Sequence, residues 1–234
     1  MTRIARIVVP RLPHLVTQRG NRAERIFFEP DDYQLYKDWL AESCRFGVAC
    51  WAYCLIPNHV HLILAPEDGT GLALALARAH RLYAGFVNAR ARQTGHLFQG
   101  RFGSVAMDED HVMAAARYVA LNPLRARLVD RARDWPHSSV RAHLSRRDDG
   151  LVCVRPLIDR APRFADLLDG DADAPEFAAL RRSERIGRPL GDAAFQDAIG
   201  RRLGRDVRPG RRGRKAKGDG PHGKKVKTVV SRNS

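Results

Sequence analysis

Two histidines, His59 and His61, interrupt the otherwise apolar segment LIPNHVHLIL at residues 55–64. The aliphatic and β-branched residues around them predict a short buried strand. Because side chains alternate along a strand, both imidazoles point to one face and Val60 points to the other. Such positions lie about 6–7 Å apart, so both rings can reach one metal ion or one phosphate. Two core histidines bonded to backbone carbonyls are the structural alternative.

Tyr118 and Asn122 supply a second pair of candidate residues, in the segment ARYVALNP. They lie four residues apart and therefore share one face of a predicted helix. A phenol with a pKa near ~10 is a poor nucleophile until a nearby cation or base helps it. A metal ion held by two histidines and an amide oxygen could polarise a phosphodiester and stabilise the charge that develops during attack. The four residues are the parts of a site in which a tyrosine attacks a DNA phosphorus. The alternatives are a tyrosine that only packs and an asparagine that caps a helix before Pro123.

The elements that would position these residues follow the order strand, helix, strand, strand, helix, strand, helix. Strands are predicted at residues 12–19, 48–56, 59–65 and within the glycine-punctuated region 95–108, and helices at about 31–46, 71–92, 109–121 and 122–129. This order predicts an α+β protein with a ferredoxin-like split βαβ fold, an antiparallel sheet and helices on one face, plus the helix of the tyrosine. The histidines then lie on an interior strand, which the helix after the fourth strand would cover. Asp31 or Asp32 is expected to cap the first helix.

Three regions are predicted along the chain: a compact unit at residues 1–145, a small helical appendage or linker at 146–200, and a basic tail at 201–234. Short helices are expected at 164–168 and 194–204, with residues 185–191 as a link between them.

The charge of the protein is concentrated in the tail. The 234 residues carry a net charge of +15, and residues 201–234 hold 13 Lys and Arg against two Asp and Glu, a net +11. This tail also mixes glycine and proline with few large apolar residues, so it is expected to be largely disordered and to bind phosphates. A merely solubilising tail is the alternative. A chain this basic usually meets a polyanion, most often nucleic acid.

The four cysteines show no CxxC spacing, which argues against a zinc knuckle or a redox motif. The segment MTRIARIVVPRLPHL is too short and interrupted for a signal peptide, and no run of 18 apolar residues predicts a membrane span. The sequence therefore predicts a cytoplasmic protein with free thiols and no membrane partner.

Several blocks in a fixed order give the sequence a family resemblance. WAYCLIPNHVHLIL is followed by GHLFQGRF, ARYVALNPLRARLV and DWPHSSVRAHL, and VPRLPHLVTQRGN precedes them. From about Arg3 to Leu144 the chain resembles the REP-associated tyrosine transposases, single-tyrosine members of the HUH nuclease superfamily that are similar to small bacterial insertion-sequence transposases.

The resemblance implies a role for each candidate residue. His59 and His61 match the metal-binding pair, Tyr118 matches the nucleophile, and Asn122 falls where related transposases place a third, amide-type ligand, although some of them have Gln there. The implied activity is cleavage of single-stranded DNA through a 5′-phosphotyrosine and rejoining by transesterification, with Mg²⁺ or Mn²⁺ as the metal. Two imidazoles favour Mn²⁺ at least as much as Mg²⁺. The implied partner is the hairpin of a repetitive palindrome, bound by a nucleoid-associated bacterial protein that is a monomer or a homodimer.

Two segments are predicted to contact this DNA, since each combines a cation, an amide and a glycine. The predicted contacts are Thr17, Gln18, Arg19, Gly20, Asn21, Arg22, Phe98, Gln99 and Arg101. Both segments could equally be ordinary turns. Basic residues of the long helix, such as Arg78, Arg81 and Arg90, could line a phosphate path or form a solvated face.

Two other functions compete with this interpretation. A histidine-triad nucleotide hydrolase would need a further histidine at the next alternate position, where this chain has Ile63. A non-catalytic protein that binds DNA hairpins could keep the fold and lack the chemistry. The presence of all four site residues argues against that alternative.

Overall fold

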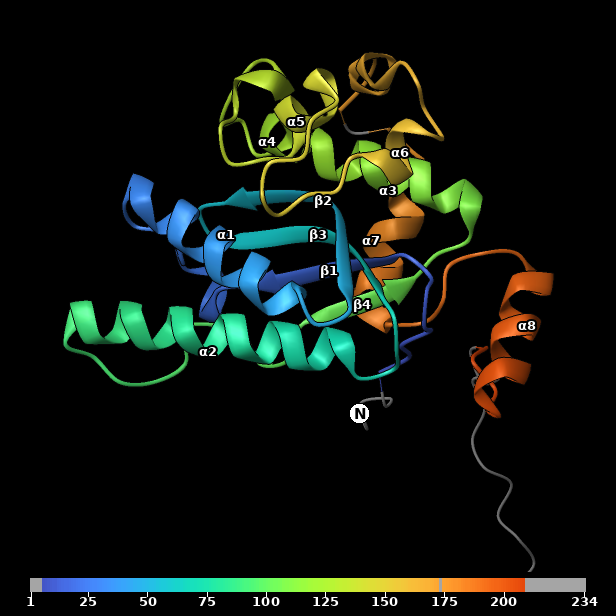
Figure 1. Cartoon of the computed structure of the whole chain (residues 1–234), viewed down its shortest axis with the longest axis horizontal. Helices are drawn as coiled ribbons and strands as arrows, with labels where there is room; N and C mark the ends of the chain where they lie inside the picture. The colour runs from blue at the N-terminus through green and yellow to red at the C-terminus, as the bar shows by residue number, and fades with distance from the viewer. Residues whose placement is uncertain (1–5, 173, 209–234) are drawn as a thin grey trace, which may run out of the picture.

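A four-stranded antiparallel sheet forms the centre of the protein, which we describe from a computed structural model over residues 6–172 and 174–208 (Figure 1). The strands are β1 (His14–Arg19), β2 (Val48–Ile56), β3 (His59–Pro66) and β4 (Gly103–Ala106). They lie in the order β2-β3-β1-β4, and every neighbouring pair is antiparallel. This is the strand order of the ferredoxin-like split βαβ arrangement, so the predicted fold class is confirmed.

Two long helices cover one face of the sheet and pack against each other. They are α1 (Pro30–Cys44) and α2 (Gly71–Ala91). In Figure 1, α1 lies in front of the strands at the left and α2 runs below them. Their buried residues repeat at helical spacing, among them Tyr36 and Leu40 on α1 and Leu76, Ala79 and Tyr83 on α2. These two helices are the pair that the βαβ pattern places on a single face.

The start of α1 differs in detail from the prediction that Asp31 or Asp32 would cap it. Glu29 is the N-cap, and Asp32 stands at the third helical position of a capping box. The carboxylate of Asp32 accepts the backbone N–H groups of Phe28 and Glu29 and also two N–H groups of Arg90. Pro30 at the first helical position explains the shift, because its fixed backbone angle favours that position and it has no N–H to satisfy.

The other face of the sheet is covered by the chain after β4. Its helices are α3 (Glu109–Ala120), α4 (Asn122–Arg125), α5 (Val140–Ser145), α6 (Arg155–Ile158) and α7 (Phe177–Ile186). Short 3-10 turns lie at Asn21–Ala23, Ala132–Asp134 and Phe164–Leu168. In Figure 1, α3 to α6 lie above the sheet and α7 passes behind it.

Residues after 145 share the core of the preceding unit. Leu151, Leu157, Phe164, Phe177 and Leu180 are buried in the same hydrophobic cluster as the residues of β1 to β3. Within the described residues, this part of the chain is thus joined to the main unit by a common core. The sequence analysis did not predict α7, and it assigned the last residues of this helix to a link.

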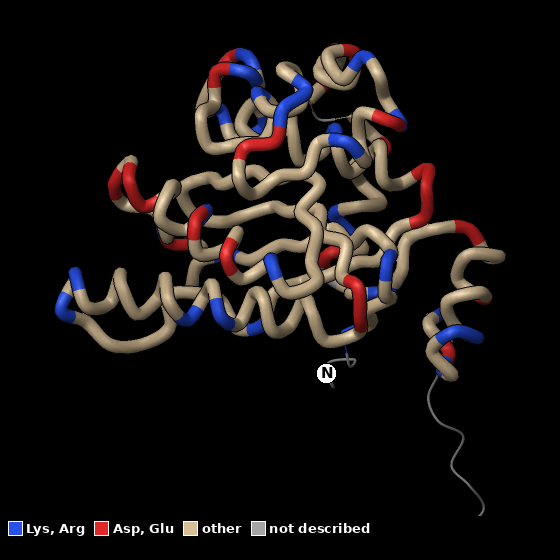
Figure 2. The backbone as a smooth tube through the Cα atoms, in the orientation of Figure 1, with Lys and Arg blue, Asp and Glu red and all other residues tan. Residues whose placement is uncertain are grey.

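The last helix, α8 (Ala193–Leu203), packs on a second cluster with Ile7, Val9 and Ala106. It agrees with the short helix predicted at residues 194–204, and its residues 201–203 also belong to the predicted tail, so the start of that tail is helical. Most of the predicted tail, residues 209–234, lies outside the described part. Within the described part, acidic and basic residues are both present over the whole molecule, whereas α2 carries basic residues and no acidic ones (Figure 2).

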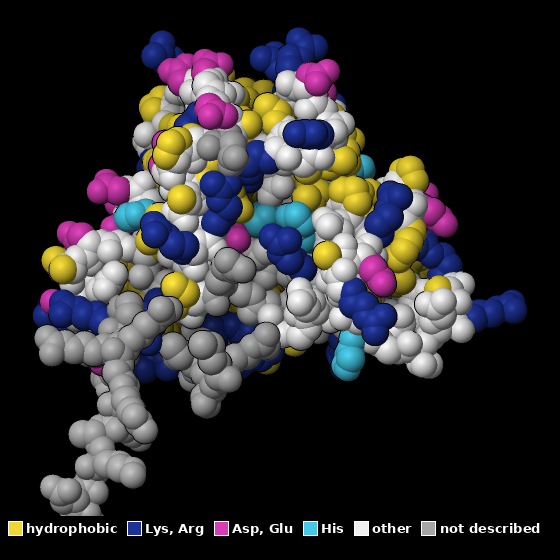
Figure 3. Space-filling view, turned by 180° about the vertical axis from the view of Figure 1, so that it is seen from behind, with side chains coloured by type: hydrophobic (Ala, Val, Ile, Leu, Met, Phe, Trp, Pro, Cys, Tyr) yellow, Lys and Arg dark blue, Asp and Glu magenta, His cyan; other side chains and the backbone are white. Residues whose placement is uncertain are grey.

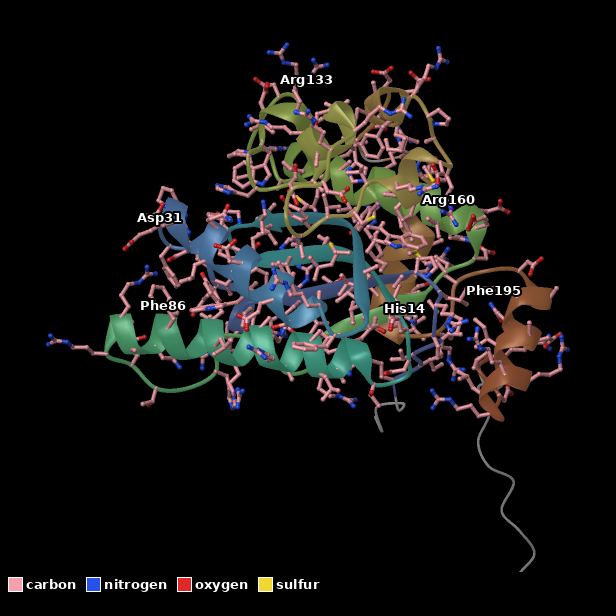
Figure 4. The ribbon with its side chains drawn as sticks, viewed as in Figure 1. His14, Asp31, Phe86, Arg133, Arg160 and Phe195 are labelled. Atoms are coloured by element: carbon pink, nitrogen blue, oxygen red, sulfur yellow. The ribbon has the colours of Figure 1, made fainter. Side chains whose placement is uncertain are left out.

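His14, at the start of β1, shows what a structural histidine looks like in this fold (Figure 4). Its Nε2 accepts the backbone N–H of Val9 at 3.1 Å and its Nδ1 lies 2.8 Å from the carbonyl of Leu12. Burial lowers the pKa of His14 to about 4, more than the bond to Leu12 raises it. Both ring nitrogens are therefore used within the fold.

The described helices include none long and apolar enough to cross a membrane. All four cysteines are free, and Cys44, Cys50 and Cys54 are buried, so burial raises the pKa of each of these three thiols.

Candidate active site

The two histidines of HVH lie side by side at the start of β3, on the face that α3 and α7 cover. Their ring centroids are 4.8 Å apart, and the rings are nearly perpendicular. Val60 between them is fully buried toward the other face. His61 is 1% exposed, whereas His59 is partly exposed. The next residue on the histidine face is Ile63, so the third histidine of a histidine-triad hydrolase is missing.

Each imidazole is held through the same ring nitrogen. Nδ1 of His59 lies 2.7 Å from Oδ1 of Asn58, and the amide nitrogen of Asn58 donates to the carbonyl of Ala23 at 3.3 Å. Nδ1 of His61 lies 3.3 Å from Oε1 of Glu184, on α7. A carboxylate or amide oxygen accepts, so the proton of each ring belongs on Nδ1. No described residue forms a hydrogen bond with Nε2 of either ring, in contrast to His14.

Burial favours the neutral form of His59, the form that binds a metal. It lowers the pKa of His59 well below its usual value, and the neighbouring His61, Arg19 and Arg125 lower it further. Two imidazoles whose Nε2 atoms form no hydrogen bond with any described residue are a donor set that suits a first-row divalent metal ion. Among the described residues, no three His, Cys, Asp or Glu side chains gather as a metal site. A third protein ligand from this part of the chain would be of another type, such as the amide of Asn122.

Tyr118 packs edge to face against His61. Its ring centroid is 5.3 Å from that of His61 and 5.3 Å from that of Phe177. The guanidinium of Arg125 stacks on its other side, 4.1 Å from the ring centroid, and donates to the carbonyl of Tyr118 at 2.7 Å. The tyrosine is 4% exposed. Helix α3 can hold it there because Val112, Ala115, Ala116 and Val119 bury the adjoining face.

The charges around Tyr118 oppose one another. Burial raises the pKa of its hydroxyl, and the carboxylate of Glu184 raises it further. Arg125, Arg181 and Arg19 lower it, but the pKa stays above its usual value. The phenol is therefore protonated near neutral pH, and a nucleophilic role requires extra positive charge or a base beside it.

Asn122 is the first residue of α4 and is 5% exposed. It comes one turn after Tyr118, just beyond Leu121, the residue that ends α3. Helix α4 packs against β2, the neighbour of the histidine strand. Pro123 is the second residue of α4, in the first helical turn, where its missing N–H leaves no helical hydrogen bond unmade.

Glu184 and Asn58 are the residues of this site that the sequence analysis missed. Glu184 lies beyond the blocks of the family resemblance, on a helix that was not predicted. Asn58 lies within the segment LIPNHVHLIL, but no role was predicted for it. Its position directly before the first histidine was the available signal, since a metal-binding histidine usually gives its second nitrogen to a nearby oxygen.

The two segments predicted to contact DNA lie next to each other. Gly20 pairs with Phe98 in an isolated antiparallel bridge, and the N–H groups of Asn21 and Gln99 donate to Leu97 and Arg19 at 2.8 Å each. A side chain on Gly20 would collide with the backbone of Glu24, so the turn needs glycine here.

A groove of about 660 Å³ opens between these segments and α2. Five of the predicted DNA contacts line it: Gln18, Asn21, Phe98, Gln99 and Arg101. Arg6, Arg81 and Arg101 give it positive charge. The other basic residues of the long helix differ from Arg81, because Arg78 pairs with Glu42 and Arg90 pairs with Asp32.

The remaining predicted contacts lie outside the groove. Thr17 points to the histidine face, since side chains alternate along β1, and its hydroxyl donates to Glu184 at 2.8 Å. Arg19 is exposed at the end of β1, where it stands opposite His59 in the β1–β3 pairing, and Gly20 and Arg22 belong to the following turn. The space-filling view from behind shows histidines at the surface with Lys and Arg side chains around them (Figure 3).

The described residues thus define an α+β chain with an HxH pair on a central strand and a tyrosine helix packed over it. Among solved structures, the chain is similar to the structure of a REP-associated tyrosine transposase bound to a REP hairpin, with a TM-score of 0.57 and 18% sequence identity. The match covers 74% of this chain and 94% of that chain. At this identity it establishes a shared fold, which is the fold expected from the family resemblance.

A second match is a bacterial tRNA(His) guanylyltransferase-like protein in complex with ATP, with a TM-score of 0.37, 9% identity and coverage of 76% of this chain and 92% of that one. This similarity is too low to support an argument. No protein-family model matches the chain, and a search of curated proteins finds no relative.

Proposed function

We propose that this protein is a metal-dependent tyrosine transposase that cleaves and rejoins single-stranded DNA at palindromic hairpins. The observation that carries the proposal is the contact between Tyr118 and His61. The ring of His61 lies beside that of His59, and no described residue forms a hydrogen bond with Nε2 of either ring. The shared fold with a transposase bound to a REP hairpin supports it. These parts come from separate elements, α3 and β3, so the arrangement is a property of the fold and not of one local motif.

The proposed reaction is a reversible exchange of phosphodiester bonds. The oxygen of Tyr118 attacks the phosphorus, a 5′-phosphotyrosine bond forms, and the bond from phosphorus to the 3′ oxygen breaks. The phenol loses its proton and the departing strand gains one as a free 3′-OH. Attack by a 3′-OH on the phosphotyrosine reverses these steps, so rejoining requires no further energy source.

His59, His61 and Asn122 are the residues that would hold the metal ion, which we propose to be Mg²⁺ or Mn²⁺. When bound, such an ion stabilises the negative charge that develops on the phosphate oxygens. The paired imidazoles, each with an oxygen on Nδ1, fit this role. Arg125 adds a fixed positive charge next to the tyrosine, which opposes the effect of burial on its pKa.

The groove beside α2 would bind the unpaired part of the DNA. It offers amides from Gln18, Asn21 and Gln99, the ring of Phe98 for stacking, and positive charge for the phosphates. Because Gln18 and Thr17 point to opposite faces of β1, a strand in the groove must pass the end of β1 at Arg19 to reach the histidines. We propose that Arg19 holds a phosphate at this crossing, in a protein that acts in the bacterial cytoplasm at the nucleoid.

A protein that binds hairpins without cutting them is the second candidate function. The burial of Tyr118 and the raised pKa of its hydroxyl favour this alternative. The two candidates differ in one product, the covalent bond between the protein and DNA.

Incubation with a single-stranded hairpin oligonucleotide and Mn²⁺ separates the candidates. The oligonucleotide should come from the palindromes that flank the gene. A transposase gives a protein–DNA adduct that survives SDS, and Tyr118→Phe abolishes it. A binding protein gives a mobility shift that SDS removes, and this result would refute the proposed activity.

A further inference from the structure

We propose that Glu184, held by Thr17, is a positioning residue that orients His61 for metal binding. The inference rests on the proposed metal site and assigns a role to a residue outside the sequence blocks of the family resemblance. In a metal centre, a carboxylate on the far nitrogen of a histidine fixes both the orientation and the tautomer of the ring.

The geometry joins three residues from three elements. Oε1 of Glu184 on α7 accepts the hydroxyl of Thr17 on β1 at 2.8 Å and lies 3.3 Å from Nδ1 of His61 on β3. The Thr17 oxygen is itself 3.5 Å from the same ring nitrogen. The ring of His61 is therefore held by two oxygens on its Nδ1 side, so its Nε2 faces away from both.

The carboxylate of Glu184 is largely shielded from solvent. Its side chain is 11% exposed, and a shielded carboxylate is costly unless it is paired. Its Oε1 accepts the hydroxyl of Thr17 and faces Nδ1 of His61. A carboxylate oxygen accepts from a ring N–H, which places the proton of His61 on Nδ1.

The position of Glu184 is fixed by close packing of its helix. A Cβ atom on Gly103 of β4 would lie 3.3 Å from the carbonyl oxygen of Glu184, so the missing side chain of Gly103 lets α7 approach the sheet. At the other end of α7, Phe177 is fully buried against Tyr118 and under the guanidinium of Arg117.

Asn58 performs the equivalent task for His59, with its Oδ1 at 2.7 Å from Nδ1. Both rings thus have an oxygen beside Nδ1. For His59 it comes from the preceding residue, Asn58, and for His61 it comes from Glu184, 123 positions further along the chain. A chain cut near residue 145 would keep all the predicted site residues but lose the group that orients His61.

Two measurements on the full chain without DNA test this role. The first is the affinity for Mn²⁺, measured from the EPR signal of the free ion for wild type, Glu184→Ala, Glu184→Gln and Thr17→Val. The second is the tautomer of His61, measured by long-range ¹H–¹⁵N NMR without metal and assigned by its absence from the His61→Gln variant. Glu42→Ala is the control, because Glu42 is an exposed carboxylate that pairs with Arg78 on the other side of the sheet.

We expect Glu184→Ala to weaken Mn²⁺ binding by about 10- to 100-fold. Glu184→Gln should lose less, because its amide oxygen can still accept from Nδ1, and Glu42→Ala should bind as wild type. The His61 signals should show a proton on Nδ1 in wild type and a mixture of tautomers in Glu184→Ala. A role limited to docking α7 would lower the melting temperature of Glu184→Ala and leave the tautomer and the affinity unchanged.

That last pattern would overturn the inference while leaving the proposed function intact. Wild type that fails to bind Mn²⁺ at all would contradict the metal site itself, and the proposed function and the inference would both fall.

Discussion

Replacement of Tyr118 by phenylalanine should remove strand cleavage and leave the fold and hairpin binding almost unchanged. The contacts described for Tyr118 involve its ring and its backbone: the rings of His61 and Phe177 at 5.3 Å, the guanidinium of Arg125 at 4.1 Å, and the hydrogen bond from Arg125 to the carbonyl. Phenylalanine preserves all of them, and no described residue forms a hydrogen bond with the hydroxyl. The free energy of unfolding should therefore change by less than about 1 kcal/mol.

The effect on cleavage should be far larger, because the hydroxyl is the nucleophile. We expect a loss of at least about a thousandfold in the single-turnover rate, as for other enzymes that lose their attacking group. The assay follows a 5′-labelled hairpin with excess protein and Mn²⁺ on a denaturing gel, with fluorescence anisotropy of the same hairpin as the measure of binding.

Tyr83→Phe is the matched control. Tyr83 is fully buried on α2, on the other face of the sheet, and its hydroxyl donates to the carbonyl of Ile26 at 2.6 Å. This variant should cut DNA at the wild-type rate and lose about 1 kcal/mol of stability, since a buried carbonyl loses its partner. Cleavage by Tyr118→Phe near the wild-type rate would refute the reasoning, and loss of cleavage in Tyr83→Phe alone would move the nucleophile to α2.

Four further outcomes are expected. His59→Ala and His61→Ala should each lose metal-dependent cleavage, as wild type should in EDTA, and full activity of either variant at limiting Mn²⁺ would show that the pair is structural. Asn122→Ala should lower cleavage less than the histidine variants, and Asn122→Asp should retain more of it because a carboxylate is also an oxygen ligand; equal rates for both variants would argue against a metal contact. Acid should destabilise the fold through His14, because its pKa is about 4 in the native chain and about 6.5 in the unfolded chain, so only the unfolded chain takes up a proton between these values. Urea unfolding should show the free energy of unfolding falling by up to about 1.4 kcal/mol per pH unit from about pH 6.5 to pH 4. An equal pH dependence in His14→Gln would contradict this prediction. Removal of residues 209–234, which leaves α8 whole, should weaken binding to all DNA at low salt and flatten the dependence of log K on log salt by roughly one unit per lost phosphate contact, with cleavage from a saturated complex retained; an unchanged slope would show that this part of the tail does not touch DNA.

Local patterns were sufficient to predict the sheet and the histidine strand. Alternation around Val60 placed both imidazoles on one face, and the order of strands and helices predicted the sheet that the structure shows. These features depend on side-chain periodicity and short connections, which are readable from neighbouring residues.

The partners of the histidines could not be predicted in the same way. Glu184 reaches His61 from 123 residues further along the chain, on an amphipathic helix with an arginine-rich exposed face, and nothing local marks its carboxylate as buried. Its environment depends on how α7 packs against Gly103, a long-range contact. The predicted DNA contacts on β1 are divided between two faces of the sheet. The hydroxyl of Thr17 donates to Glu184 on the histidine face, whereas the neighbouring Gln18 lines the groove on the other face.

The most direct test of the account is to locate the covalent bond between the protein and DNA. Trypsin cuts after Arg117 and Arg125, which releases Tyr118 in the peptide of residues 118–125. After reaction with the hairpin, digestion of the DNA and mass spectrometry, the account predicts that this peptide carries the added nucleotide through the oxygen of Tyr118. An adduct on any other residue would contradict the account, as would a hairpin that is cut with no covalent intermediate.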